Sequence, residues 1–248
     1  MHTLTATLPG PDSFKQSRFS AKTLRRLLGR GSEFELHTAD SSERVGIEQY
    51  IHRCFAKTYQ ADVTEFAPLL LSLRCAGSLS GAVGIRTADS SPLFAEAYLD
   101  RPLEQIASDI SGSSIDRDEL VEIGNMAAMR PGSGQLLNII LVAVMHGAGI
   151  RYAGFACTDI LQKILRKQHF VFHSVATANP ERLGDSAAQW GSYYDTDPSV
   201  ILVDVPATLD ELRSQYLSGA VLRFFKAEIN SLIEAFSAWR AASSATSY

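Results

Sequence analysis

Cysteine is scarce in this sequence, and its spacing excludes two kinds of small stabilised domain. The chain of 248 residues carries three cysteines, Cys54, Cys75 and Cys157. Their number is odd, they lie far apart, and no Cys-x-x-Cys pair occurs, so neither a disulfide framework nor a cysteine zinc site is supported. We expect three buried thiols.

Long apolar runs are also absent. No stretch of about 18 or more apolar residues occurs, which excludes a transmembrane helix. The N-terminal residues, MHTLTATLPGPDSF, lack a basic segment followed by a long apolar run, so they do not have the pattern of a secretory signal. We therefore expect a cytoplasmic protein and no membrane partner.

The sequence has no overall excess of positive charge. Its formal net charge of -4 argues against nucleic-acid binding over the whole surface. Residues 1–32 are the exception and form a basic N-terminal arm, which is either a solvated helix, a partly disordered segment or a docking site for an acidic partner. Up to Arg30 the arm carries Lys15, Arg18, Lys22, Arg25, Arg26 and Arg30 against a single acidic residue, Asp12.

The remaining composition is that of a globular domain. With 46% hydrophobic and 20% charged residues, the chain can bury one substantial core, and no internal repeat is found. We assign residues 33–206 to this domain and 207–248 to a C-terminal helical tail that Gly219 could break. Thr208 and Glu211 form a capping box at its start. The tail is expected to pack on the core or on a second copy, giving a homodimer.

The first part of the domain shows both strand and helix patterns. Residues 33–38 alternate like a short strand, and Ser41 or Ser42 can cap a helix that follows. Residues 69–88 read as two apolar strands around a Gly-Ser turn, an antiparallel hairpin. A further helix is expected downstream, with Pro102 interrupting or starting it.

From Leu120 the pattern alternates between strand and helix. This order favours parallel pairing of the first two strands, with the glycine-rich turn at the carboxyl end of the first, where α/β sheets bind ligands. A loop and one more strand end the domain. The expected elements are a strand at 120–129, a turn at 130–134, a helix at 135–150, a strand at 151–158, a helix at 159–170 and a strand at 171–178.

The turn Arg-Pro-Gly-Ser-Gly at 130–134 has two interpretations. Its glycines can simply supply the backbone conformations of a tight corner, or the turn can hold an anion on the unpaired N–H groups of the next helix. Gly134 is followed by Gln135 and Leu136, which excludes a P-loop and a dinucleotide fingerprint. Pro131 likewise rules out a nucleophile elbow at Ser133.

The loop resembles that of the GNAT acyltransferase superfamily, Arg/Gln-x-x-Gly-x-Gly/Ala. Gly132 and Gly134 match, whereas Met129 occupies the usually polar first position. More closely, about residues 47–205 resemble the thermostable hemolysin family, which is related to acyl-homoserine lactone synthases. The matching segments are GIRTA at 84–88, LFAEAYLDRPLE at 93–104, VEIGNMAA at 121–128 and WGSYY at 190–194.

The resemblance implies an α/β (α+β) fold: a GNAT-like mixed sheet with splayed parallel central strands, flanked by helices, plus a C-terminal helix. It implies transfer of an acyl group from acyl-CoA or an acyl carrier protein to a small amine, with no tightly bound cofactor. A membrane-lytic hemolysin and a noncatalytic acyl- or CoA-binding protein are the alternatives. The implied donor-binding residues are Met126, Ala127, Ala128, Arg130, Gly132, Ser133, Gly134 and Gln135, with the Met126 or Ala127 N–H polarising the carbonyl.

The remaining site residues also follow from the resemblance. Glu122 is a candidate base or amine anchor, or a structural partner of Arg86, which could itself bind a substrate carboxylate. Tyr193 and Tyr194 could protonate the leaving thiolate, or belong to the core. Glu96, Asp100 and Glu104 form an acidic group that either binds a cationic amine or a sulfonium donor, or is a solvated helix face. Asn125 and Thr158 complete the predicted substrate site. No metal is expected, because His169 and His173 lie where a helix gives way to a strand.

Overall fold

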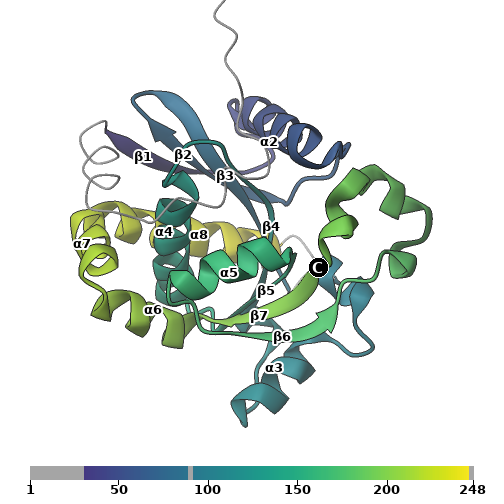
Figure 1. Ribbon diagram of the computed structural model, residues 1–248. Coiled ribbons are helices and arrows are strands. Elements are labelled where there is room, and N and C mark those ends of the chain that lie inside the picture. Colours follow the sequence, from purple (N-terminus) through teal and green to yellow (C-terminus); the bar gives the residue numbers. More distant parts are fainter. Residues whose placement is uncertain (1–30, 89–91, 246–248) are drawn as a thin grey trace, which may run out of the picture.

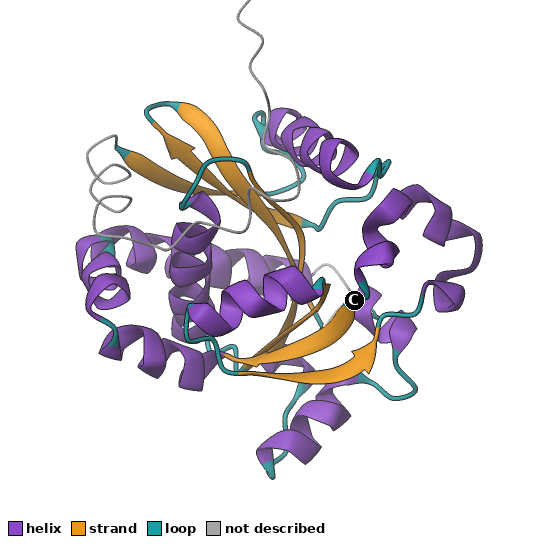
Figure 2. Cartoon of the chain, viewed as in Figure 1, coloured by secondary structure: helices purple, strands orange, loops and turns teal. Residues whose placement is uncertain are grey.

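The computed structural model describes residues 31–88 and 92–245. The six basic residues of the N-terminal arm lie outside this part. The described chain folds into one mixed sheet with helices on both faces (Figures 1 and 2). The three cysteines are buried and free, as predicted.

Seven strands form the sheet in the order β1-β2-β3-β4-β5-β7-β6. The ladders are antiparallel except for β4 and β5, which are parallel as predicted. The hairpin expected at 69–88 is β2 and β3. The strands are β1 (Ser32–His37), β2 (Leu69–Cys75), β3 (Ser78–Thr87), β4 (Leu120–Ala128), β5 (Tyr152–Cys157), β6 (Phe172–Thr177) and β7 (Ser199–Asp204).

The parallel strands β4 and β5 pair only over their first three residues. The ladder joins Leu120, Val121 and Glu122 to residues 152–154 of β5, and neither strand is paired with the other beyond it. This is the splay that the resemblance implied, and the predicted fold class is confirmed. Helices and the rest of the core fill the space on either side of the splay.

The helices divide between the two faces of the sheet. One face is covered by α4, α5 and the C-terminal helices, and α4 is so apolar that Leu136 to Met145 are all buried. The other face is covered by α2 in one part and by η2 and α3 in another. The helices are α2 (Arg44–Tyr59), α3 (Leu103–Ser111), α4 (Ser133–Gly147), α5 (Asp159–Lys167), α6 (Val205–Ser214), α7 (Tyr216–Phe224) and α8 (Lys226–Ala245), with 3-10 segments η2 (Phe94–Tyr98), η3 (Arg117–Glu119) and η4 (Pro180–Thr196).

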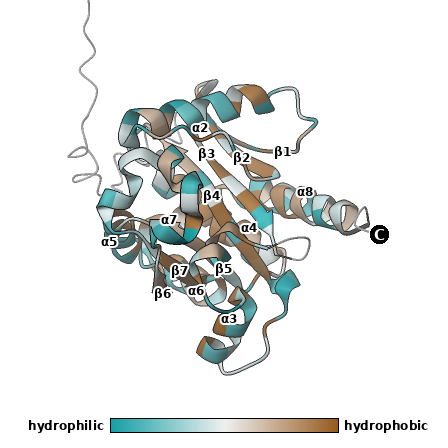
Figure 3. Ribbon diagram, turned by 90° about the vertical axis from the view of Figure 1, so that its right-hand side faces the viewer, coloured by the Kyte–Doolittle hydropathy of each residue, from teal (hydrophilic) through white to brown (hydrophobic). Residues whose placement is uncertain are grey.

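Hydropathy follows this layering. In Figure 3 the hydrophobic colour is concentrated on the central strands, whereas the outer helices carry both colours. In the described part of the chain, no helix combines the length and apolar character needed to cross a membrane.

Two predicted helix caps are wrong. The N-cap of α2 is Glu43, without a side-chain bond, because Ser41 Oγ instead lies 3.0 Å from His37 Nδ1. The capping box at Thr208 is wrong too, since α6 begins earlier: the Asp204 carboxylate accepts the Ala207 N–H at 2.8 Å. Thr208 is fully buried and bonds to Val171 instead.

The C-terminal tail is three helices rather than one. The helical segments are interrupted at Gln215, which has an extended backbone, and at Phe225. They are not interrupted at Gly219. Gly219 lies inside α7, where an added Cβ would come within 2.9 Å of a backbone carbonyl. Apolar residues of all three helices belong to the same core cluster as α4. A homodimer through this tail stays a prediction.

Candidate functional site

The glycine-rich turn joins the end of β4 to the first turn of α4. Gly132 has a φ of 87°, a conformation that favours glycine. The Leu136 N–H donates to the Gly132 carbonyl at 3.0 Å, so the helical ladder starts there. Earlier N–H groups of a helix lack intrahelical acceptors and carry the positive end of its dipole. The Ser133 N–H donates to the Arg130 carbonyl at 3.1 Å, so only later N–H groups of this first turn are candidates to bind an anion.

Three side chains of the turn differ in their surroundings. Ser133 is fully buried, and its Oγ has no hydrogen-bond partner among the residues that the structure describes. Arg130 donates from Nη1 to the Cys75 carbonyl at a long 3.4 Å. Met129, at the position that is usually polar, is 42% exposed, and its N–H donates to the Tyr50 hydroxyl. Arg130 belongs to the turn itself and is its only positively charged residue.

A bulge in β4 precedes the turn. Gly84 pairs with Gly124 but Ala82 pairs with Ala127, so one extra residue of β4 is accommodated between them. Asn125 takes up the irregularity with a φ of 49°. Its amide holds the chain before β2, accepting the Ala67 N–H at 2.9 Å and donating to the Glu65 carbonyl at 3.1 Å. These bonds give Asn125 a backbone-positioning role, and the bulge changes the direction of β4 at the splay.

The predicted donor residues follow the bulge. Ala127 and Ala128 pair with β3, and Ala127 is buried. The Met126 side chain packs against the core cluster around α4. Gly134 is close to β4 as well, since an added Cβ would lie 3.4 Å from the Ala128 side chain. The end of β4 thus lies against the start of α4.

Glu122 lies where the parallel ladder ends. It is 6% exposed, and its carboxylate accepts two backbone N–H groups of η2, Phe94 at 2.9 Å and Ala95 at 2.6 Å. Arg86, its neighbour across the β3–β4 ladder, places Nε 3.5 Å from the carboxylate. Burial raises the pKa of Glu122, although the two N–H bonds and Arg86 act in the opposite direction.

Arg86 is the less constrained member of this pair. Its side chain is 32% exposed, and within residues 31–88 and 92–245 the structure gives it no hydrogen bond besides the ion pair with Glu122. A guanidinium with free N–H donors suits bidentate recognition of a carboxylate. Both interpretations of Glu122, partner of Arg86 and site residue, are compatible with this arrangement.

The predicted acidic group does not form one cluster. Glu96 and Glu104 share the guanidinium of Arg117, at 2.8 and 2.6 Å. Asp100 is separate and pairs with Arg182 at 2.8 Å. Burial alone would raise the pKa of Glu96, but the bonds from Arg117 and from two backbone N–H groups outweigh it and lower that pKa. All three carboxylates are therefore paired with arginines that the sequence did not single out, two of them with the same one.

The two predicted tyrosines lie in an aromatic cluster. Tyr193 donates to the Ala156 carbonyl of β5 at 3.0 Å, and the Tyr194 hydroxyl lies 2.5 Å from the Tyr98 hydroxyl. Burial raises the pKa of both. Ring contacts link them to neighbours from three elements that the sequence leaves far apart, namely Phe55 and Tyr59 of α2, Phe94 and Tyr98 of η2, and Trp190 of η4.

Thr158, the last of the predicted substrate residues, follows the end of β5. Its Oγ1 accepts the Leu161 N–H at 3.2 Å and caps α5. The side chain is 6% exposed, so the cap occupies its hydroxyl in a buried position. Thr158 therefore has a structural role, as the N-cap of α5.

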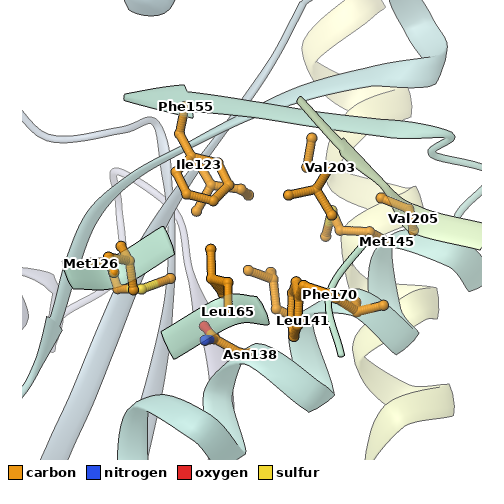
Figure 4. A pocket seen from close by; sticks show the side chains of 13 residues that line it. Ile123, Met126, Asn138, Leu141, Met145, Phe155, Leu165, Phe170, Val203 and Val205 are labelled. Atoms are coloured by element: carbon orange, nitrogen blue, oxygen red, sulfur yellow. The ribbon is translucent and has the colours of Figure 1, made fainter. Parts of the chain in front are cut away.

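A cavity of about 30 Å³ lies between the splayed strands (Figure 4). Ile123 and Met126 of β4 face Phe155 of β5 across it, and α4 and α5 close one side. Its lining is almost wholly apolar. Sequence patterns do not reveal this cavity, because its residues come from elements spread between β4 and α6, and their burial signals only a core.

The fold and this site can be compared with those of known proteins. The family model of the thermostable hemolysins matches residues 37–209, and the chain belongs to this family. No curated protein matches the sequence. The fold is that of acyl-transferring synthases in solved structures.

Two of these synthases reach a TM-score of 0.5. One is FeeM, an N-acyl amino acid synthase from uncultured soil microbes, with 14% identity and a TM-score of 0.52, covering 76% of this chain and 97% of FeeM. The other is BjaI, a CoA-dependent acyl-homoserine lactone synthase solved with SAM and isopentyl-CoA, with 15% identity and a TM-score of 0.50, covering 74% of this chain and 88% of BjaI.

Proposed function

We propose that this protein transfers an acyl group from a thioester, carried by CoA or by an acyl carrier protein, to a small amine. One observation carries the proposal: β4 and β5 separate after three paired residues, with an apolar cavity between them and the first turn of α4 at the end of β4. A donor needs an anion site for its phosphates and an apolar space for its acyl chain. The arrangement provides the start of a helix for the phosphates and an apolar lining between the strands, whose cavity of about 30 Å³ would have to widen to admit an acyl chain.

The donor head would lie on the turn at 130–134. Backbone N–H groups at the start of α4 bind phosphate oxygens, and Arg130 adds a positive charge beside them. The pantetheine arm would follow the unpaired edge of β4, and an N–H at Met126 or Ala127 would polarise the thioester carbonyl. BjaI is CoA-dependent and was solved with isopentyl-CoA, which supports a donor of this class.

The acceptor would lie beside Arg86 and Glu122. FeeM is an N-acyl amino acid synthase, and Arg86 has the free N–H donors that an acceptor carboxylate would need. Glu122 holds η2 and orients Arg86; because burial raises its pKa, it is also suited to accept the amine proton. Glu96 and Asp100 would act through their arginines, by fixing η2 and η4 around this site.

A neutral phenol would complete the reaction. Amide formation releases a thiolate, which a phenol can protonate as the bond breaks. Tyr193 already donates to a carbonyl, whereas the Tyr194 hydroxyl is paired with the Tyr98 hydroxyl, and either of these two can be the donor. Tyr194 is therefore the better donor of the two.

The test uses the full chain with acyl-CoA and with acylated carrier protein. Thiol release is followed with a thiol-reactive dye in the presence of a panel of amino acids and other small amines, and acylated products are identified by mass. We expect thiol release that depends on one acceptor and falls at least tenfold in Arg86→Ala. An Arg213→Ala variant, on the outer side of α6, is the control. If the donor binds but no acceptor in the panel gives thiol release, the proposed catalysis is contradicted.

A further inference from the structure

A second hollow lies along α2, which Figure 1 shows at the surface of the molecule. It is an open groove of about 360 Å³ between α2 and the segment that joins α2 to β2. Small-molecule sites have volumes of about 300–1,000 Å³. Five lining residues belong to α2, between Val45 and Arg53, and three belong to the joining segment, namely Val63, Thr64 and Phe66. None of them lines the cavity at the splay.

The two walls of the groove run in opposite directions. Near the start of α2, Arg44 donates to the carbonyls of Ala67 and Pro68 at 2.7 and 2.8 Å. About two turns further along α2, His52 Nδ1 lies 3.1 Å from the Val63 carbonyl. The start of α2 therefore lies beside the end of the joining segment, and the second half of α2 lies beside its beginning.

This arrangement gives the groove an apolar end and a basic end. Val45, which is 62% exposed, lies at the same end as Phe66. His52 and Arg53 lie at the other end, and the helical rise places Arg53 about 12 Å from Val45 along α2. Val63, which is buried, extends the apolar lining toward the basic end. A ligand that fits both ends has an apolar chain and an anionic head.

The donors at the basic end are available to such a head. Within residues 31–88 and 92–245, the structure gives the Arg53 guanidinium no hydrogen bond or ion pair. His52 uses Nδ1 toward the joining segment and, at 3.7 Å, toward the Asp62 carboxylate, which leaves Nε2 for a ligand. Glu48 also lines the groove, but its carboxylate accepts Arg44 Nε at 2.7 Å. No lining carboxylate in the described part of the chain thus competes for Arg53.

We propose that the groove along α2 binds a small carboxylate with an apolar chain, its charge at Arg53 and His52 and its chain between Val45 and Phe66. A guanidinium binds a carboxylate through two parallel hydrogen bonds, and one guanidinium matches its single charge. The chain would remove the exposed Val45 side chain from water. Fatty acids and N-acyl amino acids share this chemistry. The site does not depend on the proposed function, although an N-acyl amino acid is its product when the acceptor is an amino acid.

The experiment titrates the full chain with octanoate, butyrate and octylamine, and follows backbone amides by NMR to obtain both the place and the affinity of binding. We expect octanoate to shift amides of residues 45–53 and 63–66. It should bind at least tenfold more tightly than butyrate, which lacks most of the apolar chain, and than octylamine, which reverses the charge. N-octanoylglycine is titrated in the same way, and the tighter ligand of the two carboxylates identifies the source.

Arg53→Gln is expected to weaken octanoate binding about tenfold, through the loss of a charge-assisted bond. Lys57→Gln is the matched control, because Lys57 is exposed one turn further along α2 and does not line the groove. Val45→Ser should weaken octanoate about threefold and leave butyrate unchanged.

Three results would overturn the inference: no binding of either carboxylate, shifts centred on Ile123 and Phe155 at the splay, or unchanged octanoate affinity in Arg53→Gln. None of them bears on the acyltransferase proposal, which is tested by thiol release. Conversely, a protein that releases no thiol but binds octanoate at residues 45–53 would retain this site.

Discussion

Glu122 joins η2 to the sheet by hydrogen bonds, and its replacement should show how much these bonds contribute to the free energy of unfolding. The carboxylate accepts the Phe94 and Ala95 N–H groups at 2.9 and 2.6 Å and lies 3.5 Å from Arg86 Nε. In Glu122→Gln one oxygen remains to accept one N–H, while the new NH₂ faces the other donor. The variant loses one charge-assisted bond and leaves an N–H unpaired, but it is also free of the burial cost that raises the pKa of Glu122, so the net loss is about 1–3 kcal/mol.

Urea unfolding at neutral pH, followed by circular dichroism, measures this loss. Glu119→Gln is the control: Glu119 pairs with Arg151 at 3.7 Å and accepts the exposed Asp116 N–H at 3.0 Å, a bond that the Gln oxygen can keep, so stability should change by less than about 1 kcal/mol. A Glu122→Gln protein as stable as the unmodified one would refute the reasoning, because it would mean that the two N–H bonds do not require a carboxylate.

The pH dependence of stability in the same variant tests whether the pKa of Glu122 is raised in the folded state. The pKa of Glu122 is raised in the folded state, so folding favours its protonated form. Its contribution to stability is therefore fully present below the unfolded pKa, near 4.5, and is lost as the pH rises through the folded pKa. Glu122→Gln should lack this fall. An identical pH profile in both proteins would contradict the raised pKa.

Three further predictions concern the turn, η4 and the cavity. Arg130→Ala should weaken CoA binding about tenfold in calorimetry, while Arg213→Ala leaves it unchanged; equal binding would place the phosphates elsewhere. Gly191→Ala should destabilise by more than about 3 kcal/mol in thermal unfolding, because its φ is 54° and a Cβ would collide with the Tyr59 carbonyl. Gly112→Ala, with a φ of 68° and nothing within 4 Å, should cost only about 1 kcal/mol. Ala153→Val adds two methyl groups to the apolar lining between β4 and β5, so it should oppose the widening that an acyl chain requires and shorten the longest acyl chain that binds; unchanged chain-length dependence would exclude this space as the acyl site.

Most of the fold could be predicted from the sequence because its signals are local. Apolar runs of strand length alternate with longer helical repeats from Leu120 onward, and such an order leaves few ways to arrange the sheet. The predicted helix caps were wrong where other contacts use the same side chains. Thr208 has the right spacing from Glu211, but Asp204 caps α6 first, and Thr208 is used by the Val171 backbone.

The candidate site was less predictable because its partners are distant in sequence. The pairing of Glu122 with Arg86 was one of the two interpretations that the sequence left open for Glu122, and the structure shows this pair. The bonds from Glu122 to η2 span 28 residues, and the pair of Arg182 and Asp100 spans 82. No pattern in the chain specifies such contacts.

The helices beyond the family domain act on the site through α4. The family model ends at residue 209, yet α8 continues to Ala245 and packs along α4, where an added Cβ at Gly147 would collide with the Ile233 side chain. The same helix begins at the turn proposed to bind the donor phosphates and contributes part of the cavity wall along its length. Any shift of α4 would thus move the two parts of the proposed donor site together. Because α6 and α8 bury its outer side, we infer that the C-terminal helices hold α4 in register with β4.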